Sequence, residues 1–165
     1  MTADPEIAAA AQALLEAARA KGLRIAVAER CTGGLLAGAI TTPPGSSAIF
    51  DRGFVTYSNA AKSDLLGVRS ETLLEHGAVS EEVAAEMAKG ALSRSEADVA
   101  VAITGVAGPG ASAHKPEGRV CFGLATESDL VAQTVEFGAL GRDAVRAASV
   151  LRGLQFLLQL VERAP

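Results

Sequence analysis

The chain has 165 residues, a length typical of one domain with a substantial buried core. Its formal net charge is −4 and it contains no run of Lys and Arg, which argues against nonspecific nucleic-acid binding. Hydrophobic residues make up 49% of the chain but aromatic residues only 4%, a balance typical of helices packed closely on a sheet. We therefore expect one domain, residues 1–165, with a small-molecule ligand.

The cysteines and histidines give no sign of a metal site. Cys31 and Cys121 have no metal-like spacing, and His76 and His114 are isolated. We recognise neither a signal sequence nor an apolar stretch of ~18 residues. The sequence predicts a cytoplasmic protein with reduced thiols and with no metal, cofactor or membrane partner.

The first half of the chain predicts alternating helices and strands. Asp4 and Pro5 are typical of a helix N-terminus, and Gly22 is typical of its end. The elements predicted after it are a buried strand at 24–28, a helix from Thr32, which caps it, to about Thr41, a strand at 53–57, and a short helix that is capped by Ser58 or Asn59 and ends at Gly67.

The second half predicts a hairpin followed by a long helix. Ser80 opens a helix to about residue 94, and Ser70 is a candidate cap for a shorter helix before it. The remaining predicted elements are an apolar strand at 98–104, a Gly- and Pro-rich loop at 105–118, two antiparallel strands at 119–126 and 130–137, and an amphipathic helix at 142–163. Together these elements predict a three-layer α/β/α sandwich with a mostly parallel, mixed sheet, whose strand ends carry the site.

Arg30 stands out because it follows a strand directly and precedes Thr32, Gly33 and Gly34. A junction between a strand and a helix N-terminus favours anions, so an arginine here indicates something negative to bind. The segment lacks the spacing and lysine of a Walker motif. An ordinary turn explains the two glycines equally well.

Lys62 and Tyr57 are candidates for the same cleft. Lys62 lies in the first turn of a predicted helix, where the helix dipole lowers the pKa of a cation and favours a general base. A solvated surface lysine is the alternative. Tyr57 ends the preceding strand, where its hydroxyl either reaches the cleft or belongs to a half-buried ring at the sheet end.

Two further groups of residues have the chemistry of anion binding. Thr104, Gly105 and Gly108 follow a buried strand, where a hydroxyl and free backbone N–H groups can hold an oxyanion, although a simple turn is the alternative. Arg142 and Arg146 are one helical turn apart, spaced to clamp a phosphate or carboxylate. Pairing with Asp143 or Glu136 is the other explanation for these arginines.

Five ordered segments, at 43–47, 52–59, 77–80, 104–109 and 115–118, together resemble the CinA C-terminal-domain family, whose members include nicotinamide-mononucleotide deamidases. The likeness spans almost the whole chain. It implies an α/β/α fold and a pyridine nucleotide as ligand. The implied reaction is metal-free hydrolysis of the carboxamide of nicotinamide mononucleotide to nicotinate mononucleotide and ammonia.

The resemblance also implies the roles of individual residues. A family serine in Ala-Glu-Ser-Cys-Thr-Gly-Gly acts as nucleophile, and its position here is Arg30. Lys62 corresponds to the lysine that activates the serine, and Tyr57 and Thr104 to the residues that assist. The substrate-binding positions implied are Thr32, Gly33, Gly34, Ser46, Ser47, Gly105, Gly108, Arg142 and Arg146. The usual Gly-Asp-Arg before the last helix reads Leu140-Gly141-Arg142, which departs from the pattern.

Arginine cannot attack a carboxamide, because it stays protonated and has no lone pair to offer. Three hypotheses follow. Cys31 takes over as a low-pKa nucleophile, although a buried, inert thiol is its alternative. The chain has lost the activity and is a nucleotide-binding or regulatory relative. Arg30 pairs with Glu29 or a ligand phosphate, and Lys62 activates water. The apolar stripes of the first and last helices fit either core packing or a homodimer.

Overall fold

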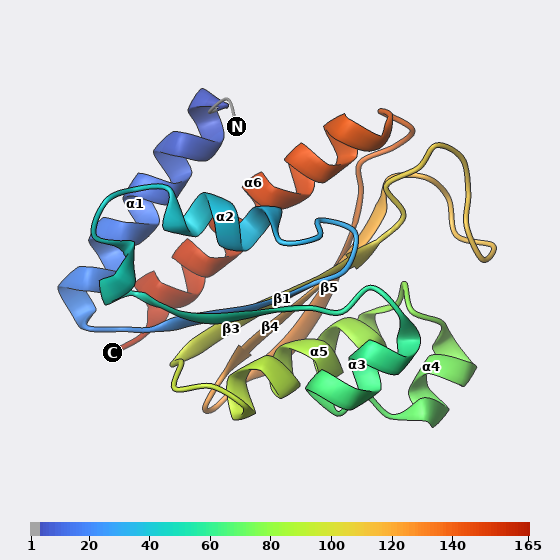
Figure 1. Ribbon diagram of the computed structural model, residues 1–165, viewed down its shortest axis with the longest axis horizontal. Helices are drawn as coiled ribbons and strands as arrows, with labels where there is room; N and C mark the ends of the chain where they lie inside the picture. Colours follow the sequence, from blue (N-terminus) through green and yellow to red (C-terminus); the bar gives the residue numbers. More distant parts are fainter. Residues whose placement is uncertain (1–3) are drawn as a thin grey trace.

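The protein is described by a computed structural model of residues 4–165, in which a central sheet separates two layers of helices (Figure 1). The strands lie in the order β2-β1-β3-β4-β5, and α1, α2 and α6 cover one face while α3, α4 and α5 cover the other. The strands are β1 (Ile25–Glu29), β2 (Phe50–Val55), β3 (Val99–Gly105), β4 (Arg119–Thr126) and β5 (Leu130–Glu136). The helices are α1 (Pro5–Lys21), α2 (Leu35–Thr41), α3 (Asn59–Leu66), α4 (Ser70–His76), α5 (Glu81–Ser93) and α6 (Arg142–Arg163), with a 3-10 turn at Ser46–Ala48.

The predicted α/β/α fold with a mixed sheet is confirmed, with one difference in strand direction. β1 pairs in parallel with β2 and β3, whereas β3 pairs with β4, and β4 with β5, in antiparallel register. The sheet therefore has as many antiparallel as parallel pairings. The chain reverses in the loop at 106–118 and returns along β3 instead of crossing over through a helix.

The two faces of the sheet differ in side-chain size. On the α1/α6 face, strand side chains such as Val27, Val101 and Ile103 are large and fully buried. On the α5 face, the alternating positions are small, among them Ala26 and Ala102. Small side chains let α5 approach closely, and a side chain added at Gly123 of β4 would collide with the backbone of α5.

Two helix starts differ in their capping. Ser58 caps α3 as predicted, because its Oγ accepts from the N–H of Ala61 at 3.0 Å. Thr32 does not cap α2, so this prediction is wrong: α2 begins at Leu35, and the Thr32 hydroxyl is buried without a hydrogen-bond partner. The cap of α2 comes instead from the carboxylate of Glu29 in β1.

The last helix is longer and more apolar than a typical surface helix. By length and composition α6 could cross a membrane, with a window of mean hydropathy 1.3, although the sequence predicted no apolar stretch long enough to do so. Its apolar stripe, which includes Val150, Leu154 and Leu157, is buried in the core shared with α1 and the sheet. This packing is that of a core helix in a globular domain.

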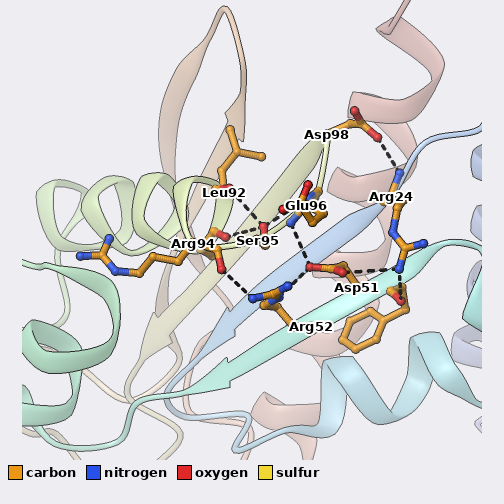
Figure 2. A network of polar contacts seen from close by, with 11 residues as sticks. Arg24, Asp51, Arg52, Leu92, Arg94, Ser95, Glu96 and Asp98 are labelled. Carbon is orange, nitrogen blue, oxygen red and sulfur yellow. Dashed lines mark hydrogen bonds and ion pairs between the residues drawn. The ribbon is translucent and has the colours of Figure 1, made fainter.

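A polar network joins the three parallel strands at the end where they begin (Figure 2). Asp51 accepts from the side chain of Arg52 at 2.7 Å and from the backbone N–H of Glu96 at 3.0 Å, and it pairs with Arg24 at 3.4 Å. The backbone N–H of Arg24 donates to the carboxylate of Asp98 at 2.8 Å. The Glu96 hydrogen bond and the two arginines lower the pKa of Asp51.

Candidate functional site

The predicted cleft lies at the opposite end of the sheet, where β1, β2 and β3 finish side by side. A cavity of about 290 Å³ opens there, lined by Arg30, Cys31, Tyr57, Arg142 and the loop at 105–112. Its size is at the lower end of the range for small-molecule sites. Residues from four separate segments of the chain thus meet where the sequence predicted a site.

The side chain of Arg30 lies in this cavity and is held by neutral groups. Its Nη1 donates to the carbonyl of Gly105 at 2.8 Å, and its guanidinium carbon lies 5.2 Å from the centre of the Tyr57 ring. That placement combines a hydrogen bond with a cation–π contact. Its Nε is buried and has no partner. The hypothesis of an Arg30–Glu29 ion pair is wrong, because Glu29 points toward α2.

Glu29 caps the helix that follows it in the chain. Its two carboxylate oxygens accept from the backbone N–H groups of Leu36 at 2.9 Å and Ala37 at 3.0 Å, and the side chain is buried. Gly33 and Gly34, with φ of 55° and 104°, make the tight turn that lets α2 fold back onto the strand. Because a protein carboxylate already occupies the N-terminus of α2, these N–H groups are not free for a ligand phosphate.

Cys31 is buried in the core beside the site. Its side chain is 3% exposed, and burial raises the pKa of the thiol to about 11, against the opposing effect of Arg30. The expectation of a lowered pKa is therefore wrong. The thiol stays protonated near neutral pH and does not supply a thiolate nucleophile.

Lys62 is fully buried, which excludes the alternative of a solvated lysine. Its Nζ donates to the carbonyls of Thr56 at 3.0 Å and Tyr57 at 3.3 Å. Burial, followed by the charge of Arg30, lowers the pKa of Lys62 to about 8. The predicted direction is confirmed, but its main cause is burial.

Tyr57 and Arg142 meet at the mouth of the cavity. The Arg142 Nη2 donates to the Tyr57 hydroxyl at 3.3 Å, and its Nη1 donates to the carbonyl of Gly108 at 2.9 Å. The Arg142 hydrogen bond, then the charges of Arg142 and Arg30, lower the pKa of Tyr57. Arg142 makes no ion pair with Glu136, which pairs with Arg119 at 2.6 Å.

The glycine-rich loop after β3 lines the cavity, whereas Thr104 does not. The Thr104 hydroxyl is buried and donates to the carbonyl of Ala78 at 2.7 Å, so its proton is already used. Glu117 accepts from the N–H groups of Gly110 at 2.7 Å and Gly141 at 2.9 Å, which fastens the loop to the start of α6. Sequence reasoning missed Glu117, although its place at the end of a glycine-rich loop is a usable signal.

Six of the nine proposed binding residues lie outside the lining of this cavity: Thr32, Gly33, Gly34, Ser46, Ser47 and Arg146. Ser46 and Ser47 precede β2, at the end of the sheet where the parallel strands begin. Within a single copy of the chain they therefore lie at the opposite end of β2 from Tyr57. Arg146 donates to the carbonyl of Cys31 at 3.0 Å. It also borders a larger cavity of about 640 Å³, lined mainly by apolar side chains of α1, α2 and α6.

No metal site accompanies these groups. Within residues 4–165, no cluster of three or more His, Cys, Asp or Glu side chains could hold an ion. Arg30 and Arg142 line the described cleft together with Tyr57, whereas Lys62 is buried outside its lining, with its Nζ bonded to the carbonyls of Thr56 and Tyr57. Such an arrangement can bind an anionic ligand, and Lys62 can exchange a proton near neutral pH.

Known proteins share both the sequence and the fold. The family model of the CinA C-terminal domain matches residues 7–161. A protein named nicotinamide-nucleotide amidohydrolase PncC from Enterobacter agglomerans is 53% identical over 144 residues, which cover 87% of this chain and 88% of that protein. One of the same name from Escherichia coli K12 is 48% identical, over 94% and 95% of the two chains. The crystal structure of competence/damage inducible protein CihA from Agrobacterium tumefaciens superposes with a TM-score of 0.93 at 46% identity, covering 97% of this chain and 99% of that one.

Proposed function

Because this chain belongs to the CinA C-terminal domain family, we propose that its cleft binds a pyridine mononucleotide and that Arg30 has removed the serine-dependent amidohydrolase reaction. The names of the relatives support the ligand and the ancestral reaction. Arg30 supports the loss, because its side chain lines the cavity and the resemblance implies a serine nucleophile at this position of the chain.

The neighbouring groups do not replace that hydroxyl. The Cys31 thiol is buried with a raised pKa, and the Thr104 hydroxyl donates to the carbonyl of Ala78. Loss of a covalent nucleophile typically leaves only residual catalysis from binding and electrostatics, near ~10³ over water. We therefore expect the protein to bind the nucleotide and to hydrolyse it slowly or not at all.

Lys62 carries the second candidate function. A lysine whose pKa is about 8 is partly deprotonated near neutral pH and can take a proton from water. In this proposal Lys62 takes a proton from a water molecule whose oxygen forms a bond to the carboxamide carbon. The C–N bond then breaks, and the nitrogen leaves as ammonia with the proton returned by Lys62, while Arg30 binds the ligand. If Lys62 activates water, the native protein should hydrolyse the amide. This turnover should be lost in Lys62→Met and kept in Cys31→Ala.

Ammonia release from nicotinamide mononucleotide tests the main proposal. We expect no measurable turnover from the native protein and restored turnover from Arg30→Ser. The double variant Arg30→Ser/Lys62→Met serves as the control, because it restores the hydroxyl without the base and is expected to stay inactive. Robust native turnover, or an Arg30→Ser variant that binds the nucleotide without hydrolysing it, contradicts the proposal.

A further inference from the structure

Neither the two cations that line the cleft, Arg30 and Arg142, nor the buried Lys62 beside it has an acidic partner among the described residues. Arg30, Lys62 and Arg142 form no ion pair within 4.0 Å among residues 4–165, although the whole chain carries a formal charge of −4. The two acids beside the cleft are used elsewhere. Glu29 binds the N-terminus of α2, and Glu117 binds backbone N–H groups of the loop and of α6.

This surplus of positive charge is held in place before any ligand arrives. Arg30 is anchored by the Gly105 carbonyl and by the face of the Tyr57 ring, and Arg142 is anchored by the Gly108 carbonyl. Both anchors are neutral, so the charges of the two guanidinium groups remain uncompensated. A binding group fixed in this way loses little conformational entropy when the ligand binds.

Lys62 lies close enough to Arg30 for the two charges to act on each other. Burial is the main cause of the lowered pKa of Lys62, and the charge of Arg30 lowers it further. A second positive charge close to a buried cation is unfavourable unless an anion compensates it. The pocket therefore has a free-energy reason to take up negative charge at its inner end, near Arg30.

The amide nucleotide does not provide that charge. Nicotinamide mononucleotide has a cationic pyridinium ring and a neutral carboxamide, so its base end would meet Arg30 with like charge. The corresponding acid, nicotinate mononucleotide, has a carboxylate on the same ring. A guanidinium is well suited to a carboxylate, since its planar donors match the two oxygens.

From these observations we propose that Arg30 has converted the cleft into a receptor for the acid form of the nucleotide, a pyridine mononucleotide whose ring carries a carboxylate. The inference rests on the proposed function, because it takes the pyridine mononucleotide as the ligand class. The carboxylate binds Arg30 at the inner end of the cavity. The phosphate lies toward Arg142 at its mouth.

Calorimetric titration of the native protein with each of the two nucleotides tests the inference. We expect the acid to bind at least about tenfold more tightly than the amide, a difference of about 1.4 kcal/mol. Arg30→Gln keeps a side-chain amide near Gly105 but removes the charge. It should lose this preference while still binding the amide.

Arg142→Gln is the matched control, because it removes a cation of the same cleft at the other end of the ligand. It should weaken both nucleotides by a similar factor and keep the preference for the acid. Thermal unfolding of each variant shows that it is folded before it is titrated.

The outcomes separate the two proposals. Equal affinity of the native protein for acid and amide overturns this inference and leaves nucleotide binding intact. Binding of neither nucleotide by the folded native protein overturns both proposals. A preference for the acid that persists in Arg30→Gln also overturns the inference, since the charge of Arg30 is then not its cause.

Discussion

Lys62 shows how one residue can be costly for folding and useful at a site. Its pKa of about 8 lies below the usual 10.5, because the charged ammonium is buried and faces Arg30. The unfolded chain therefore binds more protons than the folded one between these two values. The free energy of unfolding therefore rises with pH between these two values. The full cost of burying the charged Lys62 applies below about pH 8.

Replacement of Lys62 by Met should reveal this cost as a pH-dependent difference. From pH 7 to pH 10.5, the free energy of unfolding of the native protein should rise relative to Lys62→Met by up to about 3 kcal/mol. Urea unfolding of both proteins at the two pH values measures it. In the Arg30→Ser background the difference should shrink, because one of the two causes is gone. A difference that does not change with pH contradicts the lowered pKa.

Tyr57 offers a direct optical readout of the charges in the cleft. It is the single tyrosine of a chain without tryptophan, so the ultraviolet absorbance of the phenolate reports this residue alone. The hydrogen bond from Arg142 is the main cause of its lowered pKa, and the charge of Arg30 is a smaller one. Arg142→Gln should therefore raise the pKa of Tyr57, and Arg30→Gln should raise it less.

Arg152→Gln is a suitable control for this titration. Arg152 lies over the rings of Phe137 and Phe156 and not at the cleft. Its removal should leave the absorbance titration of Tyr57 unchanged. A titration curve that is the same in the native protein and in Arg142→Gln would show that the Arg142 hydrogen bond does not form in solution.

At the scale of elements, the turn between β1 and α2 depends on a carboxylate supplied by the strand. Glu29 accepts from two N–H groups of α2, and its side chain is 1% exposed. Glu29→Gln keeps the shape but leaves one accepting oxygen and no charge for the positive end of the helix. We expect it to lower the free energy of unfolding by about 1–3 kcal/mol, measured by urea unfolding.

Asp4→Asn is the matched change at an exposed helix start. Asp4 caps α1 by accepting from the N–H of Glu6 at 2.8 Å, and asparagine caps a helix about as well as aspartate. This control should change stability by less than about 0.5 kcal/mol. Equal effects of the two substitutions would mean that the burial of Glu29 does not matter for its cap.

The same elements show what a sequence can predict. α1 and α6 were predicted to within a residue, because proline, glycine and a long apolar stripe act through local geometry. The cap of α2 was not predicted, because Glu29 lies seven residues before Leu36, whose N–H group it accepts from. The antiparallel return of β4 was also missed, because the loop at 106–118 has the length of either connection.

The candidate site could also be predicted only in part: the sequence suggested its residues but not their contacts. Their places at strand ends and helix starts, and the family pattern, made Arg30, Tyr57, Lys62, Thr104 and Arg142 candidates. Of these, Arg30, Tyr57 and Arg142 line one cavity. Their contacts depend on the folded chain: the burial of Lys62 and the bond from Thr104 to Ala78 come from segments far apart in sequence. The place of Ser46 and Ser47 was missed for that reason, since a motif fixes an order along the chain and not the end of the sheet.

At the scale of the whole molecule, polar groups are divided between the two ends of the sheet. The cleft has unpaired cations where the parallel strands finish, whereas Asp51 pairs with Arg24 and Arg52 where they begin (Figure 2). The paired end holds β1, β2 and the segment before β3 together. We infer that ligand affinity and the stability of the sheet depend on separate groups of charges.

Asp51→Asn tests this separation. The pKa of Asp51 is lowered in the folded chain, so its contribution to stability is present above its usual pKa of 3.8 and is lost as the pH falls through the lowered value. At pH 7 the substitution should lower the free energy of unfolding by about 1–2 kcal/mol. The loss relative to the native protein should shrink as the pH is lowered below 3.8. Nucleotide affinity at pH 7 should stay at the native value, because the cleft lies at the other end of the strands. A stability difference that persists unchanged at low pH, or a changed affinity in a folded variant, would show that the two ends of the sheet are coupled.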